Sequence, residues 1–138
     1  MTGRDLKRVL QGIEEYSLPT PDYIVADVGA SIYSLKAGRW TLHGDWESRL
    51  ALSWGNIGSM KVHSVLEDMH DLISQEDSRQ RYFKRSYYFP EDADKIILCR
   101  DVQALLAQSN MPASLVVSHD PEKSVGLLDV LPADANKA

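Results

Sequence analysis

The sequence has little cysteine, no long apolar run and no excess of positive charge. Its 138 residues include one cysteine, Cys99, which excludes an internal disulfide and a cysteine metal cluster and is typical of a reducing compartment. No apolar run approaches the roughly 18 residues of a membrane span, and the first residues lack the basic start and apolar middle of a secretion signal. We therefore expect a cytoplasmic protein without a membrane partner.

The charge balance argues against nucleic acid as a partner. With 20 acidic and 15 basic residues the net charge is −5, so a polyanion would meet net repulsion. One basic cluster is interleaved with aromatic residues and comprises Arg79, Arg81, Lys84 and Arg85. We interpret it as a solvated strand edge rather than a nucleic-acid platform, and a local site for one phosphate or sugar is an intermediate interpretation.

Between Leu18 and Tyr33 the sequence changes from a helical pattern to a strand pattern. Pro19 and Pro21 end a preceding helix, because neither has an N–H to donate. Residues 23–26, Tyr-Ile-Val-Ala, form a short apolar run typical of a strand covered on both faces in a parallel sheet. Gly29 then allows a sharp turn, and residues 31–35 alternate polar and apolar like a half-buried strand.

Periodicity predicts the helices. Helix 4–16 has one core-facing stripe, and Thr2 stands where its hydroxyl could form the N-cap. Further helices are expected over 45–54, 59–74 and 92–109. In the second helix Trp46, Leu50 and Trp54 share a face and are expected to be packing anchors. The buried side of the last is expected to include Ile96, Ile97, Val102, Leu105 and Leu106.

The strand signals complete an α+β fold. Strands are expected over 31–42, folded as a hairpin at Gly38, and over 82–89, 114–118 and 125–131. We predict one open, mostly antiparallel sheet of these strands with two or more helices on one face. His63 and His70 lie two helical turns apart in helix 59–74, too far to share a metal ion, so no metal ligands are predicted.

Strand 82–89 carries the main binding signal. Alternation places Lys84, Ser86 and Tyr88 on one face and the residues that can pack on helices on the other, namely Phe83, Arg85, Tyr87 and Phe89. An amine, a hydroxyl and a phenol on one sheet face can hydrogen-bond a sugar. The alternative for Lys84 is a solvated strand lysine.

Four stretches together resemble the sucrose-phosphate phosphatases, a branch of the haloacid dehalogenase (HAD) superfamily. They are Leu-Pro-Thr-Pro-Asp-Tyr through Val-Gly-Ala-Ser-Ile-Tyr in residues 18–33, Thr-Gly-Arg in residues 2–4, Lys-Arg-Ser in residues 84–86, and the passage 128–137. The resemblance implies that Thr2 holds the transferring phosphoryl group and that Lys137 neutralises nucleophile and phosphate. It also implies that Arg4, Lys84, Ser86 and Tyr88 bind the substrate.

The same resemblance implies a division of the chain. Residues 1–28 would belong to the HAD α/β core, residues 29–131 would form a cap domain of the HAD type-IIB kind, and residues 132–138 would return to the core. The family's Asp-x-Asp nucleophile motif should lie before residue 1, so we expect the chain alone not to hydrolyse phosphate esters. Mg²⁺ serves the complete family, and we expect none to bind this chain alone.

Three classes of function follow. The leading one is the sugar-phosphate-recognising portion of a phosphohydrolase, with a second copy, a core domain or a glycosyltransferase domain completing it. The second is a non-catalytic sugar-binding or regulatory domain of a sucrose-phosphate synthase-type glycosyltransferase. The third is a ferredoxin-like interaction module without a sugar site. The sequence leaves open which sugar phosphate binds.

Overall fold

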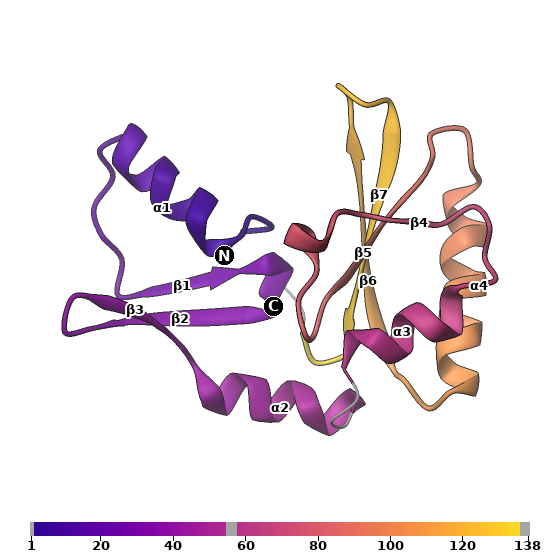
Figure 1. Ribbon diagram of the computed structural model, residues 1–138, viewed down its shortest axis with the longest axis horizontal. Coiled ribbons are helices and arrows are strands. Elements are labelled where there is room, and N and C mark those ends of the chain that lie inside the picture. The colour runs from indigo at the N-terminus through magenta and orange to yellow at the C-terminus, as the bar shows by residue number, and fades with distance from the viewer. Residues whose placement is uncertain (1, 55–57, 136–138) are drawn as a thin grey trace.

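The computed structural model describes residues 2–54 and 58–135. Two antiparallel sheets lie side by side along the long axis of the molecule (Figure 1). In chain order the elements are α1 (Leu6–Glu15), β1 (Tyr23–Ala26), the 3-10 turn η1 (Asp27–Gly29), β2 (Ser31–Lys36), β3 (Arg39–Leu42), α2 (Gly44–Trp54), α3 (Ser59–Leu66), β4 (Ile73–Ser74), the 3-10 turn η3 (Asp77–Arg79), β5 (Arg85–Pro90), α4 (Lys95–Gln108), β6 (Ala113–Asp120) and β7 (Val125–Pro132).

The prediction of a single sheet is wrong. The smaller sheet has the order β1-β2-β3 and the larger one β4-β5-β7-β6. Hairpin 31–42 pairs with β1, with Ile24 opposite Tyr33 and Tyr33 opposite Leu42. The reason is local: Asp27, Val28 and Gly29 have φ of 51°, 59° and 97°, and this left-handed turn folds β2 back along β1. β1 is therefore antiparallel to its neighbour, and its Tyr23 is 63% exposed.

The N-terminal segment lies along the free edge of β1. Thr2 N donates to Val25 O at 2.9 Å, and Asp27 N donates to Arg4 O at 2.9 Å. Helix α1 begins at Leu6 and its N-cap is Asp5, whose carboxylate accepts from Arg8 N. Thr2 is thus not the N-cap, and its Oγ1 accepts from Arg4 N instead. The apolar stripe of α1 is half-buried rather than buried against the described core.

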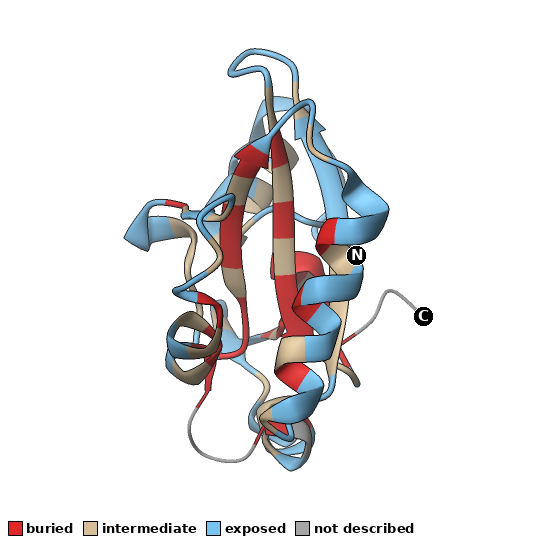
Figure 2. Ribbon diagram, turned by 90° about the vertical axis from the view of Figure 1, so that its right-hand side faces the viewer, coloured by how far each residue is buried: buried red, intermediate tan, exposed pale blue. Residues whose placement is uncertain are grey.

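The larger sheet carries helices α3 and α4 on one face, as predicted for the fold class, and buried residues concentrate between that face and α4 (Figure 2). Phe83, Tyr87 and Phe89 contribute to this core, which confirms the predicted apolar face of the segment. Helix α2 bridges the two parts, because Trp46 Nε1 donates to Gly29 O and Trp54 Nε1 donates to Pro112 O, each at 2.9 Å.

Several helices and strands have other ends, or another buried face, than the sequence predicted. Helix α3 ends at Leu66, and residues 73–74 form β4 on the edge of β5. Strand β5 begins at Arg85, because residues 81–84 close a tight turn. In α4 the buried stripe is Leu98, Val102 and Leu106, whereas Ile96 and Ile97 are 82% and 45% exposed. Leu98, Val102 and Leu106 are four residues apart and therefore share one face of the helix, which Asp94 caps. None of the described helices is both long and apolar enough to cross a membrane.

Candidate functional site

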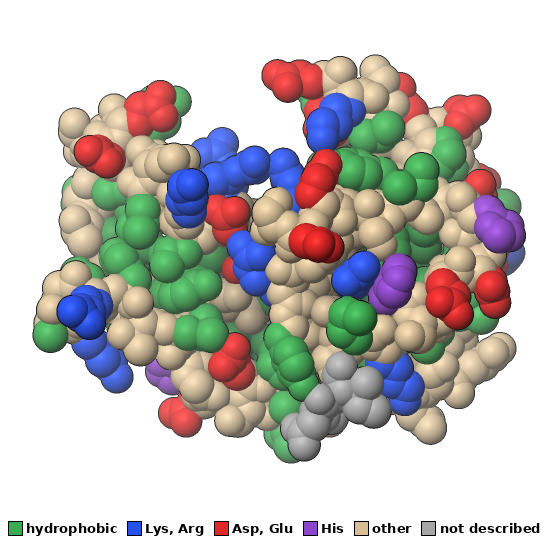
Figure 3. All heavy atoms as spheres, viewed as in Figure 1, with side chains coloured by type: hydrophobic (Ala, Val, Ile, Leu, Met, Phe, Trp, Pro, Cys, Tyr) green, Lys and Arg blue, Asp and Glu red, His purple; other side chains and the backbone are tan. Residues whose placement is uncertain are grey.

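A charged cleft lies where the small sheet faces the loop that leads into β5. It encloses about 220 Å³ and is lined by Gly3, Arg4, Asp5, Arg8, Asp27, Ser78, Arg79, Arg81 and Lys84. A second hollow of about 280 Å³ continues from it over the open face of the larger sheet and shares Gly3, Arg79 and Lys84 with the first. Figure 3 shows basic side chains gathered around the hollow between the two halves of the molecule.

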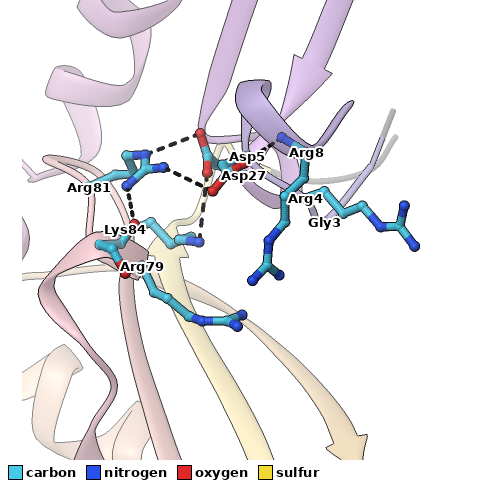
Figure 4. Close-up of a pocket in the computed structure, with 9 residues that line it drawn as sticks. Gly3, Arg4, Asp5, Arg8, Asp27, Arg79, Arg81 and Lys84 are labelled. Carbon is cyan, nitrogen blue, oxygen red and sulfur yellow. Dashed lines mark hydrogen bonds and ion pairs between the residues drawn. The ribbon is translucent and has the colours of Figure 1, made fainter. Parts of the chain in front are cut away.

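Asp27 lies at the centre of this cleft (Figure 4). It is fully buried in η1, and its carboxylate stands 3.5 Å from Arg81 Nε and 3.8 Å from Lys84 Nζ. These are ion pairs, and neither carboxylate oxygen accepts a hydrogen bond from the described residues. Asp27 thus connects the small sheet to the cations of the loop before β5.

Arg81 is held beside Asp27 by contacts of its guanidinium. Its Nη1 donates to Ser78 O at 2.9 Å and to Gln80 O at 2.7 Å, while Nη2 lies 3.8 Å from the Asp5 carboxylate. Two acidic residues, Asp5 and Asp27, therefore balance one guanidinium. Arg81 is consequently better suited to fixing the two parts relative to each other than to binding an incoming anion.

Lys84 is buried, which rules out the solvated strand lysine as its state. Burial lowers the pKa of its ammonium below the ordinary value; Asp129 and Asp27 oppose this change, and Arg81 and Arg79 reinforce it. A buried cation needs paired carboxylates to remain charged. The position of Lys84 between Asp27 and Asp129 provides them.

Ser86 lies on the same face as Lys84 and donates from Oγ to Asp129 Oδ1 at 2.6 Å. Ser86 does not line either hollow, and neither does Tyr88. The Tyr88 hydroxyl donates to Glu76 Oε1 at 2.8 Å and accepts from Lys123 Nζ at 3.0 Å on the exposed surface. The structure therefore brings Lys84 and Ser86 together with Asp129, and keeps the Tyr88 hydroxyl in a separate network.

The residues predicted from the Thr-Gly-Arg motif divide between two places. Arg4 lines the charged cleft, and no carboxylate pairs with it within 2–54 and 58–135. Thr2 instead lines a shallow apolar hollow beside α1. Lys137 lies outside the described residues.

Several members of the site were missed in the sequence, among them Asp27, Arg79 and Arg81. Asp27 stands as an acidic residue inside an otherwise apolar run before Gly29, which is the signal that could have identified it. Arg79 and Arg81 were grouped with Arg85 as a strand edge, yet they line the cleft, whereas Arg85 donates to Ser74 Oγ in β4. The intermediate interpretation, a local phosphate or sugar site, fits their positions.

The cleft does not fit a divalent cation. No three His, Cys, Asp or Glu side chains gather to hold a metal in the part of the chain that the structure describes. Its two carboxylates, Asp5 and Asp27, both pair with Arg81, and Lys84 adds a further positive charge beside them. What this arrangement can do chemically is bind an anion and hydrogen-bond hydroxyl groups.

Solved structures share this architecture. A sucrose-phosphatase from Synechocystis sp. PCC6803, solved with sucrose and phosphate, aligns over 99% of this chain and 50% of its own, with a TM-score of 0.79 and 22% identity. The haloacid dehalogenase-like hydrolase yhjK from Bacillus subtilis aligns over 95% of this chain and 49% of its own, with a TM-score of 0.55 and 15% identity. Both comparisons support the predicted HAD-like fold.

Sequence relatives agree with the structural ones. A putative HAD-like hydrolase from Nitrosococcus oceani is 33% identical over 99% of this chain and 37% of its own length. A mannosylfructose-phosphate phosphatase from Agrobacterium fabrum is 29% identical over 99% of this chain and 50% of its own. The chain thus spans half or less of the length of these relatives. The model of the Sucrose-6F-phosphate phosphohydrolase family matches residues 1–138, and the chain therefore belongs to that family of HAD hydrolases, as its motifs predicted.

Proposed function

We propose that this chain forms the sugar-phosphate-recognising part of a HAD phosphohydrolase of the sucrose-phosphate phosphatase type. The observation that carries the proposal is the composition of the cleft, where five cations face only two carboxylates. A site with this excess of positive charge attracts a phosphate dianion and holds it with charge-assisted hydrogen bonds.

Arg4 and Arg79 are the proposed phosphate ligands. Arg4 is unpaired among the described residues, and Arg79 has only a 3.6 Å contact with the exposed Glu76. A guanidinium group binds phosphate oxygens through two parallel N–H donors. Arg4 and Arg79 can do this without breaking an ion pair to a buried carboxylate. Arg81 and Lys84, which face Asp27, are less available for this task.

Lys84 and Ser86 are the proposed sugar ligands. Lys84 stands in the turn just before β5 and Ser86 stands in the strand, and both lie beside Asp129, so a sugar hydroxyl that reaches Lys84 would meet this polar group. The adjacent Asp129 adds an acceptor beside the Lys84 donor. Donors and acceptors that alternate in this way can hydrogen-bond the neighbouring hydroxyls of a sugar. A phosphorylated sugar would place its ring beside Lys84 and Asp129 and its phosphate beside Arg4 and Arg79.

The proposed activity of this part is binding rather than bond cleavage. Asp5 and Asp27 both form ion pairs with Arg81, and Lys84 adds a second cation beside Asp27, so we assign these two carboxylates to balancing charge in the cleft. Thr2 and Lys137 are proposed to assist phosphoryl transfer in the whole protein, where bound Mg²⁺ supplies charge neutralisation. The 138-residue chain alone is expected not to hydrolyse sucrose 6-phosphate.

We also propose that the chain contains parts of two domains. The predicted division assigns residues 1–28 to a core and 29–131 to a cap. The pairing of β2 and β3 with β1, and not with the larger sheet, favours a boundary later in the chain, near His43.

A regulatory sugar-binding domain is the second candidate, because the ion-paired carboxylates favour binding without cleavage. Cytoplasmic location and a completing partner domain remain predictions. The two candidates differ in the whole protein: Mg²⁺-dependent phosphate release from sucrose 6-phosphate supports the hydrolase, and tight binding without release supports the regulator.

Calorimetric titration of this chain with sucrose 6-phosphate tests the proposal. We expect saturable binding that Arg4→Ala weakens about tenfold, since a charged hydrogen bond is lost. Arg39→Ala is the matched control, because Arg39 is exposed in β3, outside the cleft. Absence of binding, or equal effects of the two substitutions, would refute the assignment of the cleft.

A further inference from the structure

Asp27 carries buried oxygen atoms with unused hydrogen-bonding capacity. The residue is fully buried, and neither Oδ1 nor Oδ2 accepts a hydrogen bond from any residue in 2–54 and 58–135. Its cationic neighbours stop at 3.5 Å and 3.8 Å, beyond hydrogen-bond contact. Buried polar atoms nearly always have such a partner, so these oxygens call for a specific explanation.

The backbone that presents this carboxylate is strained. Asp27 and Val28 have φ of 51° and 59°, and a β-branched residue rarely adopts this left-handed conformation. Hydrogen bonds from Asp27 N to Arg4 O and from Val28 N to Thr2 O hold the turn in place. Strain of this kind persists where surrounding contacts impose it, and it is concentrated at binding and catalytic sites.

The charges around Asp27 determine which chemical group can donate a hydrogen bond to its carboxylate. Arg81 and Lys84 oppose a further cation, and the carboxylate itself repels an anion at contact distance. A neutral donor meets neither penalty. The Asp27 side chain borders the cleft but is only 1% exposed, so a hydroxyl reaches it from the cleft only when neighbouring side chains shift. We propose that Asp27 accepts a hydrogen bond from a hydroxyl of the sugar and so determines specificity for a phosphorylated polyol.

This inference rests on the proposed function, because the sugar must enter the cleft. It also assigns the two ends of the ligand to different residues. A sugar hydroxyl donates to Asp27 beside Lys84, and the phosphate binds Arg4 and Arg79. The hydrogen bond to Asp27 should therefore form with a neutral sugar and not with inorganic phosphate.

Carbon-13 NMR of the Asp27 carboxyl in the unaltered chain gives a direct test. Sucrose should move this resonance in a saturable way, and inorganic phosphate should move it much less. If sucrose moves the Lys84 resonances but leaves the Asp27 carboxyl unchanged, the carboxylate does not contact the sugar and the inference is wrong. If neither sucrose nor sucrose 6-phosphate binds, the proposed function fails and this inference fails with it.

Asp27→Asn gives a second test, because asparagine tolerates the left-handed backbone and keeps the shape of the side chain. Replacing a charged acceptor by a neutral one should raise the Kd for sucrose and sucrose 6-phosphate about tenfold and leave the Kd for inorganic phosphate unchanged or lower. Asp22→Asn, an exposed position just before β1, is the control and should change none of the three. An equal loss of sucrose and phosphate binding in Asp27→Asn would instead show a purely structural role.

Discussion

The hydroxyl of Ser86 donates a 2.6 Å hydrogen bond to Oδ1 of Asp129 across the paired strands β5 and β7. Ser86 is almost fully buried, so its hydroxyl supplies a donor that solvent cannot readily replace. Ser86→Ala should lower the free energy of unfolding by about 1.5–3 kcal/mol, the range for hydrogen bonds to charged groups. Urea denaturation would measure the change. Ser118→Ala, at an exposed position in β6, should change it by less than about 0.5 kcal/mol.

Lys84 and Arg85 lie on opposite faces of their segment, and only Lys84 lines the cleft. We predict that Lys84→Met weakens sucrose 6-phosphate binding about tenfold, equivalent to about 1.4 kcal/mol, while Arg85→Met leaves it nearly intact. Methionine keeps the length and the apolar stem of both side chains. Titration calorimetry at one pH compares the two variants, and equal losses would mean that the sugar-facing side of β5 is wrongly assigned.

The lowered pKa of Lys84 predicts a pH dependence of sugar binding. Its neighbours are Asp129 on β7, Asp27 in η1, and Arg79 and Arg81 in the preceding loop. The ammonium donates strongly to hydroxyls and the neutral amine does not, so affinity should fall as pH rises through this pKa, which lies below the ordinary 10.5. Titrations from neutral to alkaline pH would show the decrease.

Lys84→Arg is the control for this pH dependence, because a guanidinium keeps its charge over the whole range. Its affinity should stay flatter with pH than that of the unaltered chain. A profile that falls equally in both proteins would assign the titration to another group.

Gly126 in β7 packs against the ring of Phe89. A Cβ at this position would clash with Phe89 Cε2 and Cζ, and the ring is buried and cannot readily move away. Gly126→Ala should therefore destabilise the chain by about 1–3 kcal/mol through overpacking. Thermal unfolding followed by circular dichroism would measure this.

Gly12, unlike Gly126, has room for a side chain. The residue sits inside helix α1, and apart from its chain neighbours and the backbone of that helix no described atom lies within 4 Å of a Cβ added there. Gly12→Ala should stabilise the chain by about 0.5–1 kcal/mol, because alanine favours the helix. A loss of stability in Gly12→Ala, or none in Gly126→Ala, would contradict the packing described for these positions.

The amino-acid sequence by itself determined the local elements and the family. The alternation of residues 82–89 predicted which side chains face the core, because the two-residue period of an extended chain is a local property. The spacing of Trp46, Leu50 and Trp54 likewise predicted the packing face of α2. The motifs in residues 2–4, 18–33 and 84–86 identified the family that the comparisons confirm.

Only the tertiary structure decided how these elements combine. Hairpin 31–42 pairs with β1 instead of the larger sheet, because three consecutive left-handed residues reverse the chain at η1. That same turn buries Asp27 against Arg81 and Lys84, residues more than fifty positions away in the sequence. Side-chain periodicity describes one segment at a time, whereas the charge pattern of the cleft depends on contacts between distant segments.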